Sequence, residues 1–491
     1  MPLSKLQFKP GINREGTNYS NEGGWFDGDK IRFRNGLPER IGGWTRVSNT
    51  QITGTPRKIF DFVTLSSQNL LFIGTELKVF LENAGTFNDI TPIRSTVTLG
   101  SNPVNTTGGA GSGVVTITTQ SAHGAATSDF VTLASLTATD GITAAQLNTE
   151  HQITSVPSST TFTIDTGGSA SSGSTAGGGS SGTAAFQITT GLNTTVLGSG
   201  WGAGTWGRFT WGSGAGSLSG QTLRLWSADN FGEDLIFNIA DSTIYYWDAT
   251  NGTSTRAVEL SSLTGASDVP TKARKILVSD VDRHCIAFGT NPIGSGTLDP
   301  LLIRFSSQEE PQNWTPSATN TAGDLRLSKG SEIITAVQTS RQILVWTDQS
   351  LYSMQFLGPP FTFGVSMLGD NIRIAGPNTA LAVNDVVFWM GQENFYLYDG
   401  RIQAIPCSVR DYVFGDMNNQ QSFKFHAGSI GSQTEIWWFY VSSGATEVDR
   451  YVVYNYGQKV WYYGTLVRTA WNDRASGLRS FPQATGADFY L

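Results

Sequence analysis

The side chains that most often carry catalysis or hold metals are few in this chain, and their spacing fits no known site. No HxH or HxxxH pair occurs among its four histidines, His123, His151, His284 and His426. The neighbours His284 and Cys285 suggest a base beside a nucleophile, but consecutive side chains of a strand point to opposite faces. We therefore predict no catalytic residue, metal or cofactor, and expect Cys285 to pack as a small apolar side chain.

Carboxylates offer a second chemistry, because glycosidases cut sugars with two facing acids. The candidate acids are Asp27, Asp29, Asp234, Glu309, Glu310 and Asp399. We interpret Asp399 as part of a two-residue Asp-Gly hairpin turn, and the adjacent Glu309 and Glu310 as a solvated turn before Pro311. No SxDxGxTW run of the kind found in sialidase propellers occurs. The favoured interpretation of these acids is structural.

The most informative segment is NEGGWFDGDKIRFRNGLPERIGGW, residues 21–44. In it Lys30, Arg32 and Arg34 alternate with Ile31 and Phe33, which predicts a strand with three cations on one face and two apolar side chains on the other. A solvated edge strand uses such cations against aggregation. The alternative is a positive strip that meets a neighbouring subunit or the phosphates of DNA. The interface or DNA-channel candidates are Trp25, Lys30, Arg32, Arg34, Arg40 and Trp44.

A repeated plan predicts the elements that position these residues. Six segments share an alternating strand, an aromatic residue near its end, a polar turn and a second short strand. The equivalent aromatic residues are Tyr246, Phe305, Tyr352, Tyr398 and Tyr454. They are about 59, 47, 46 and 56 residues apart, close to the roughly 40 to 50 residues of one four-stranded propeller blade. The sequence thus predicts an all-β fold, a β-propeller of about five to seven blades.

Residues 95–220 interrupt the repeat with a stretch rich in Gly, Ser, Thr and Ala. The runs GVVTITT, SDFVTLASL, HQITSV and TTFTIDT alternate as strands do, and ITAAQLN is the one good helix candidate. We predict a small β domain inserted into the first or second blade through flexible glycine linkers. The domains are then residues 1–94 (N-terminal segment and first blade), 95–220 (inserted domain) and 221–491 (remaining blades).

Composition limits the class of protein. With 38% hydrophobic residues and 11% aromatic residues the chain can build a packed core, which excludes a wholly disordered protein. Its net charge of −7 argues against nonspecific wrapping of nucleic acid on the outer surface. No apolar run approaches the roughly 18 residues of a membrane span, the N-terminus lacks a signal-peptide pattern, and two cysteines give no disulfide framework. We expect synthesis and folding in a cytoplasm.

Several of these stretches together resemble one protein family. The opening PGINREGTNYSNEGGWFDGDKIRFRNGLPERIGGW is similar to the start of tail tube proteins of short-tailed bacteriophages. The similarity continues in IRFSSQEEPQNWTP, in VWTDQSLYSMQF with GPPFTF, and in WMGQENFYLYDGRIQAIPCSVRDYVF. The residues from 123 to 166 resemble small β modules of phage virion proteins. The chain therefore resembles the packaged DNA stabilization proteins, also called tail hub or nozzle proteins.

The resemblance implies a structural virion protein and no enzyme. It implies a propeller that forms a hexameric ring below the portal and its adaptor protein, closes the DNA-filled head, extends the ejection channel and carries tail fibres or spikes. The partners would be copies of this chain, the adaptor, a fibre or spike protein and, transiently, genomic DNA. The location would be the virion tail, assembled in the host cytoplasm. The alternatives are a receptor-binding or polysaccharide-degrading phage tail protein and a cellular binding module.

Overall fold

The computed structural model of the 491-residue chain describes residues 8–17, 19–195, 222–358, 360–473, 483–486 and 491. Nearly all regular structure in these residues is β-strand. The two α-helices are short: α1 (Ala144–Leu147) and α2 (Arg410–Gly415). The predicted all-β class is confirmed. No helix among the described residues is long and apolar enough to cross a membrane.

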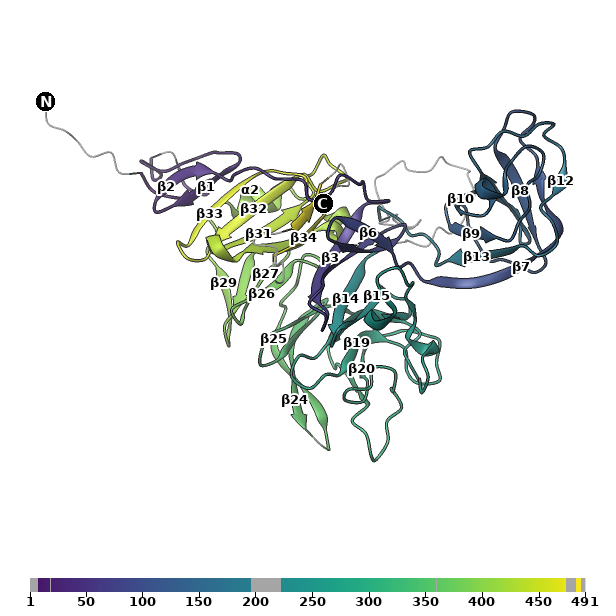
Figure 1. The fold of residues 1–491 in the computed structure, drawn as a ribbon. Coiled ribbons are helices and arrows are strands. Elements are labelled where there is room, and N and C mark those ends of the chain that lie inside the picture. Colours follow the sequence, from purple (N-terminus) through teal and green to yellow (C-terminus); the bar gives the residue numbers. More distant parts are fainter. Residues whose placement is uncertain (1–7, 18, 196–221, 359, 474–482, 487–490) are drawn as a thin grey trace, which may run out of the picture.

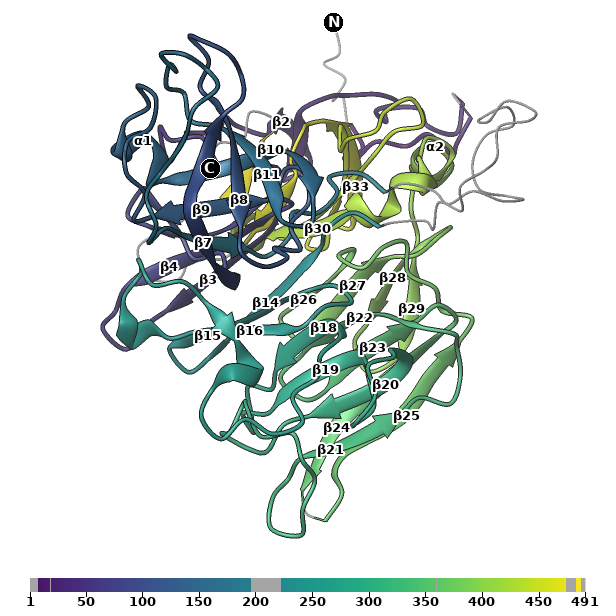
Figure 2. The ribbon, with the colours of Figure 1, turned by 90° about the vertical axis from the view of Figure 1, so that its right-hand side faces the viewer.

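Six four-stranded antiparallel sheets form the blades of a propeller (Figures 1 and 2). The first blade is β3 (Pro56–Val63), β4 (Asn69–Thr75), β5 (Val79–Asn83) and β6 (Thr86–Asp89). The second is β14 (Trp226–Phe231), β15 (Asp234–Ile239), β16 (Ile244–Trp247) and β17 (Val258–Glu259). The third is β18 (Ala273–Val278), β19 (Cys285–Thr290), β20 (Asp299–Phe305) and β21 (Gly323–Arg326).

The other three blades follow in chain order. The fourth is β22 (Ile333–Gln338), β23 (Ile343–Thr347), β24 (Ser350–Gly358) and β25 (Thr362–Asp370). The fifth is β26 (Ala380–Val383), β27 (Val386–Met390), β28 (Phe395–Tyr398) and β29 (Ile402–Ile405). The sixth is β30 (His426–Ile430), β31 (Glu435–Tyr440), β32 (Arg450–Asn455) and β33 (Val460–Thr465).

The aromatic residues used to predict the repeat lie on the same strand of their respective blades. Each lies on the third strand of its blade: Tyr246 on β16, Phe305 on β20, Tyr352 on β24, Tyr398 on β28 and Tyr454 on β32. Large apolar side chains between neighbouring sheets form the core, including the fully buried Trp346 and Trp389 between the fourth and fifth blades. The sequence repeat and the blade are therefore the same unit.

A two-stranded sheet completes the ring. β34 (Ala470–Asn472) pairs with β35 (Gln483–Thr485) and lies between β30 of the sixth blade and β3 of the first. Asn472 donates a hydrogen bond to Asp61 on β3 at 2.6 Å, and the Trp471 ring nitrogen donates to the Ser429 carbonyl on β30 at 3.1 Å. These contacts join the first and last blades.

The inserted domain follows β6 and precedes β14, so it lies between the first two blades (Figure 1). Six of its strands close into a barrel, and short β12 (Ala176–Gly177) adds to β7. The six strands are β7 (Ile93–Thr106), β8 (Val114–Thr119), β9 (Phe130–Ala134), β10 (Glu150–Ser158), β11 (Thr161–Asp165) and β13 (Thr183–Gln187). The predicted helix is α1. At its start the Thr143 side chain accepts a hydrogen bond from the Gln146 N–H, and the Gln146 side chain accepts one from the Thr143 N–H.

Two details complete the comparison with the sequence. The Asp399-Gly400 turn was predicted as a two-residue hairpin, which is wrong: Tyr398 pairs with Ile402, so Arg401 is a third turn residue. Gly400 has a φ of 116°, a conformation that suits only glycine. The predicted domain boundary at residue 220 lies outside the described residues.

Candidate functional site

The N-terminal segment, residues 8–48, lies along the sixth blade, and its hairpin of β1 (Ile31–Arg34) and β2 (Leu37–Arg40) packs near β33 (Figure 1). The backbone N–H of Ile12 donates to the Trp461 carbonyl of β33 at 2.7 Å. Ile12 and Phe33 are almost wholly buried in the core of the sixth blade. Contacts within the chain thus hold the segment against the sixth blade.

Arg32 lies inside the protein. Its guanidinium contacts both carboxylate oxygens of Glu435 on β31, with Nε at 3.0 Å from Oε1 and an Nη at 3.2 Å from Oε2. Tyr462 and Trp437 donate to the same carboxylate at 2.5 Å and 2.9 Å. Arg32 is 9% exposed and Glu435 1% exposed. Burial raises the pKa of Glu435, although Tyr462 and Arg32 favour its charged form.

The predicted strip of three free cations is therefore wrong in its geometry. Arg32 and Arg34 do point to one side, but that side faces the sixth blade: Arg34 donates to Gln433 at 2.8 Å and pairs with Glu39 at 3.1 Å. Lys30 precedes the strand with a φ of 57°, so it does not share the alternation. The sequence could not show this, because the carboxylate that accepts Arg32 lies about 400 residues away.

The other predicted residues lie at the surface of the segment or half-buried in it. Arg40 is exposed at the end of β2. Trp25 is half-buried, with ring centroids 5.6 Å from Phe8 and 6.3 Å from Phe33. Trp44 packs edge-on against Trp471, with centroids 5.4 Å apart, and is still 43% exposed. The structure does not test their role as interface residues, so that role stays a prediction.

Exposed apolar side chains concentrate in this segment. Six of the fifteen large apolar side chains exposed in the described parts of the chain belong to it: Phe8, Tyr19, Phe26, Leu37, Trp44 and Val47. Tyr19 is 92% exposed and Leu37 64% exposed. A hollow of about 500 Å³ lies between residues 41–47 and the sixth blade, with Trp44 and Trp437 in its wall. Apolar surface gathered in this way is typical of a contact with another protein.

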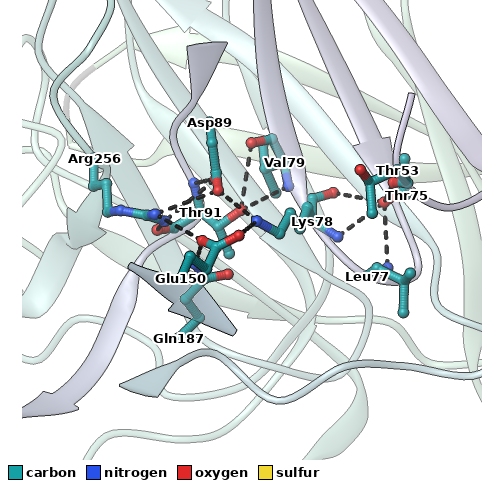
Figure 3. A network of polar contacts seen from close by, with 10 residues as sticks. All are labelled: Thr53, Thr75, Leu77, Lys78, Val79, Asp89, Thr91, Glu150, Gln187 and Arg256. Atoms are coloured by element: carbon teal, nitrogen blue, oxygen red, sulfur yellow. Dashed lines mark hydrogen bonds and ion pairs between the residues drawn. The ribbon is translucent and has the colours of Figure 1, made fainter. Parts of the chain in front are cut away.

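A network of charges that the sequence did not predict fixes the barrel to the propeller (Figure 3). Glu150 of the barrel pairs with Lys78 of the first blade and lies 3.3 Å from Arg256, which follows β16 of the second. Asp89 at the end of β6 binds the same two cations, at 2.9 Å and 3.3 Å. Burial opposes the charge of Asp89, but Lys78 and Arg256 outweigh it and lower its pKa. The barrel is thereby anchored to two blades.

His284 and Cys285 diverge as predicted. His284 is fully buried, with Nδ1 3.0 Å from an oxygen of Asp282 and Nε2 2.8 Å from the Thr321 hydroxyl. Cys285 points into the core between the second and third blades, and burial raises the pKa of its thiol. No group of three or more metal-ligating side chains occurs among the described residues.

The acids weighed for sugar chemistry fall into two groups. Asp234 and Glu309 line one groove of about 670 Å³, together with Tyr246 and Arg283. Asp234 accepts hydrogen bonds from Tyr246 and from the Ala249 N–H at 2.9 Å. The remaining acids lie elsewhere, each bound to a neighbour: Asp27 to Arg14, Asp29 to Thr465, Glu310 to Asn313 and Asp399 to Gln403.

No protein-family model and no curated protein matches the chain. One similar solved structure is the extracellular domain of a protein described as a one-component system of B. thetaiotaomicron, with a TM-score of 0.31, 10% identity, and coverage of 49% of this chain and 27% of that one. Another is the phage phi92 endosialidase, with a TM-score of 0.22, 11% identity, and coverage of 82% of this chain and 55% of that one.

Proposed function

We propose that the chain is a structural virion protein, a tail hub or nozzle subunit of a short-tailed bacteriophage. Six copies would form a ring below the portal and adaptor, close the DNA-filled head, form the ejection channel and carry fibres or spikes. The proposal rests on the ordered motifs that resemble this family and on a propeller with a projecting barrel. It makes the protein a part of an assembly, located in the tail and formed in the host cytoplasm, and no enzyme.

The observation that carries the proposal is the exposed apolar surface of the N-terminal segment. Six large apolar side chains are exposed within residues 8–47, although the buried Arg32–Glu435 pair holds the segment in one position. A monomer gains nothing from such exposure, whereas a subunit buries it against a neighbour. Because the segment is already ordered, docking costs little conformational entropy. We therefore assign Trp25–Trp44 to a contact with a second copy or with the adaptor.

The charge of the chain suits a channel through which DNA moves. A net charge of −7 weakens adhesion to phosphates, so the genome can slide. Exposed cations such as Arg40 allow brief contacts that do not depend on base sequence. Negative-stain electron microscopy of the chain, alone and with the portal and adaptor of the same phage, tests the proposal. We expect a six-fold ring with a central channel; a monomer that ignores the portal complex would overturn it.

A single substitution tests the segment itself. Leu37→Ser removes the 64% exposed leucine at the start of β2 and should weaken ring or adaptor assembly about tenfold, since one apolar side chain fully buried at a contact contributes roughly 1.5 to 3 kcal/mol. Leu65→Ser is the matched control, because Leu65 is 85% exposed in the β3–β4 turn, outside the segment. Native mass spectrometry measures both. Equal assembly of the two variants would remove the segment from the interface.

The groove at Asp234 and Glu309 favours a second candidate, a receptor-binding or polysaccharide-degrading phage tail protein. Three carboxylates, Glu233, Asp234 and Glu309, and one arginine around an open groove suit a hydroxyl-rich ligand. Asp234 is already bound by Tyr246 and a backbone N–H, which is the reason for its lower rank. Incubation with capsule polysaccharide, with Glu309→Gln as the control, tests it. Release of reducing ends by the unaltered chain and not by the variant would favour this function.

A further inference from the structure

A second group of exposed apolar side chains lies on the β24–β25 hairpin of the fourth blade. Phe356 and Leu357 lie near the end of β24, Phe361 immediately precedes β25, and Met367 is on β25. With the N-terminal segment, this hairpin accounts for ten of the fifteen large apolar side chains exposed in the described parts of the chain. The contact proposed above uses the segment and gives the hairpin no role.

The end of the hairpin extends beyond the rest of its blade. Within the described residues, β23 pairs with β24 only as far as Met354, which lies opposite Ile343. Residues 355–358 of β24 pair with β25 alone. Figures 1 and 2 both show the hairpin at the end of the molecule away from the β1–β2 hairpin. A contact at this tip therefore leaves the N-terminal segment free for a partner of its own.

The base of this extension is fixed against the third blade. Phe363 on β25 is buried against Phe305 of β20, with ring centroids 4.9 Å apart. The Thr362 hydroxyl donates a hydrogen bond to the Thr321 carbonyl, in the connection between β20 and β21, at 3.2 Å. Gly358 pairs with Thr362 across the turn. Because the tip is already ordered, docking it costs little conformational entropy.

The hairpin and the connection beside it contain no charged residue. Residues 349–369 and 311–323 include no Asp, Glu, Lys, Arg or His. With 14% charged residues in the whole chain, about five would be expected in two stretches of this combined length. The hydrogen bond from Thr362 to Thr321 joins the two stretches. The hydrocarbon of a bilayer excludes charge, and neutral polar side chains suit its head-group region.

The exposed apolar side chains lie on both faces of the hairpin. Phe356 and Leu357 are consecutive on β24, so their side chains point to opposite faces. They are 41% and 60% exposed, and Phe361 is 73% exposed. A flat protein surface covers one face of a hairpin, whereas lipid surrounds a projecting tip on every side. This distribution favours a lipid surface over a flat protein partner.

We propose that the β24–β25 hairpin inserts its tip into a lipid bilayer, with Phe356, Leu357 and Phe361 at the boundary between head groups and acyl chains. The insertion is shallow, because residues 355–358 have a strand partner on one side only within the described residues, and the hydrocarbon core does not tolerate unpaired backbone groups. Lipid binding is independent of the tail role, so ring assembly and lipid binding can each fail without the other.

Flotation of the full chain with phosphatidylcholine vesicles tests lipid binding. We expect half of the protein to be bound at about 1 mM lipid or less. Binding should be equal at about 50 mM and about 500 mM salt, because burial of apolar side chains and not charge provides it. Vesicles that also contain phosphatidylserine should bind the protein no better, since the chain carries a net charge of −7.

One charge placed at the tip tests which part of the protein meets the lipid. Leu357→Asp should weaken vesicle binding at least about tenfold, because the charge must enter the bilayer or hold the tip out of it. Leu65→Asp is the matched control, the same substitution at an 85% exposed leucine whose N–H already donates to Glu233. It should bind vesicles like the unaltered chain. Both variants should unfold within about 2 °C of that chain, because each substituted side chain is exposed.

A fluorescent label separates insertion of the tip from binding elsewhere. Leu357→Cys and Leu65→Cys each carry a polarity-sensitive thiol label. The unaltered chain, treated in the same way, corrects for labelling of Cys285 and Cys407. We expect vesicles to shift the emission to the blue for the label at residue 357 and not for the label at residue 65.

Four outcomes would overturn the lipid contact. The first three are no vesicle binding by the unaltered chain, equal binding by the two Asp variants, and an unshifted label at residue 357. The fourth is binding that needs anionic lipid and is lost at high salt, which would assign the contact to exposed cations. Weaker ring assembly of Leu357→Asp together with no vesicle binding would assign the hairpin to a protein partner instead. A monomer that binds vesicles as expected would remove the tail role and support the lipid contact.

Discussion

Burial determines what each charged side chain of the N-terminal segment does. Arg32 is enclosed with Glu435 and acts as a clamp between residues far apart in the chain, whereas Arg34, two residues later, is half-exposed and pairs at the surface. A cation that is enclosed with its counter-charge cannot also bind a DNA phosphate. Under the proposed function, contacts with DNA or with a neighbour would use exposed cations of the segment such as Lys30, Arg34 and Arg40.

Arg32→Met should destabilise the protein more than any other single change of a cation in this segment. It leaves the Glu435 carboxylate buried without its counter-charge, a loss of about 3 to 5 kcal/mol in the free energy of unfolding. Arg34→Met, the control at an exposed pair, should cost less than about 1 kcal/mol. Denaturant titration measures both. Similar losses in the two variants would show that the Arg32–Glu435 pair is not a clamp.

His426 gives the fold a pH dependence. It is buried on β30 and stacks on Phe439, with ring centroids 4.9 Å apart. Burial lowers its pKa to about 4. The hydrogen bond with the Lys424 carbonyl and the charge of Glu447 raise the pKa, but by less than burial lowers it. The unfolded chain binds the proton near pH 6.5 and the folded chain only near pH 4, so stability falls as pH falls through this window.

The expected loss between pH 6.5 and pH 4 is about 3 kcal/mol. The contacts of Glu447 lower its pKa to about 2, although burial raises it. Its contribution to the free energy of unfolding is therefore lost only as pH falls from about 4.5 toward 2. The upper part of the window therefore separates the two groups. Denaturant titrations at intervals from pH 7 to 5 should show that His426→Gln loses less stability on acidification than the unaltered chain; Asp229, whose pKa burial raises to about 6, acts in the opposite direction in both proteins. An unchanged slope in that variant would assign the effect to another group.

At the scale of elements, ion pairs as well as the covalent backbone join the barrel to the blades. β7 and β13 connect the barrel covalently to its neighbours, and the network of Lys78, Asp89, Glu150 and Arg256 fixes its orientation (Figure 3). The Lys78 ammonium also lies 4.5 Å from the ring centre of Phe130 on β9. Because three elements meet there, the loss of one carboxylate affects the whole junction.

Glu150→Gln tests this junction. The variant leaves Lys78, whose side chain is 7% exposed, with Asp89 alone and should weaken the barrel–propeller contact by about 1 to 2 kcal/mol. Asp165→Asn is the control, since Asp165 lies at the end of β11 within the same barrel. Hydrogen exchange of β9 and β10 and the radius of gyration from small-angle scattering are the measurements. No difference between the variants would mean that apolar contacts alone position the barrel.

At the scale of the whole molecule, the ring depends on how its two ends meet. β34 lies between the first and sixth blades, and the Trp471 ring packs directly on Gly428 of β30. A side chain at Gly428 would place its Cβ 2.3 Å from the Trp471 ring, too close for any real contact. The closing strand therefore reaches β30 only because that position has no side chain.

Gly428→Ala should lower the free energy of unfolding by about 1 to 3 kcal/mol, because the Trp471 ring or the backbone must move. Gly444→Ala in the loop after β31 of the same blade is the control, since nothing lies within 4 Å of an added Cβ there, and it should change stability by less than about 0.5 kcal/mol. Thermal and denaturant unfolding measure both. A neutral Gly428→Ala would show that the closure tolerates a shift of the strand.

The sequence by itself determined the elements of this protein. The spacing of five aromatic residues predicted the blades, and period-two alternation predicted four of the six barrel strands, β8 to β11, because both depend on side chains near in sequence that share one sheet. The strand β1 and the divergence of His284 from Cys285 followed from the same local rule, whereas the pairing of β1 with β2 was not predicted.

Only the tertiary structure decided which charged groups are free. The partner of Arg32 is about 400 residues away, and Glu150 of the barrel meets cations of two blades. These contacts form where the ring closes and where the barrel packs on the propeller. No periodic pattern in the sequence predicts them. A local pattern gives the direction of a side chain, while its burial and charge depend on what the closed fold places opposite it.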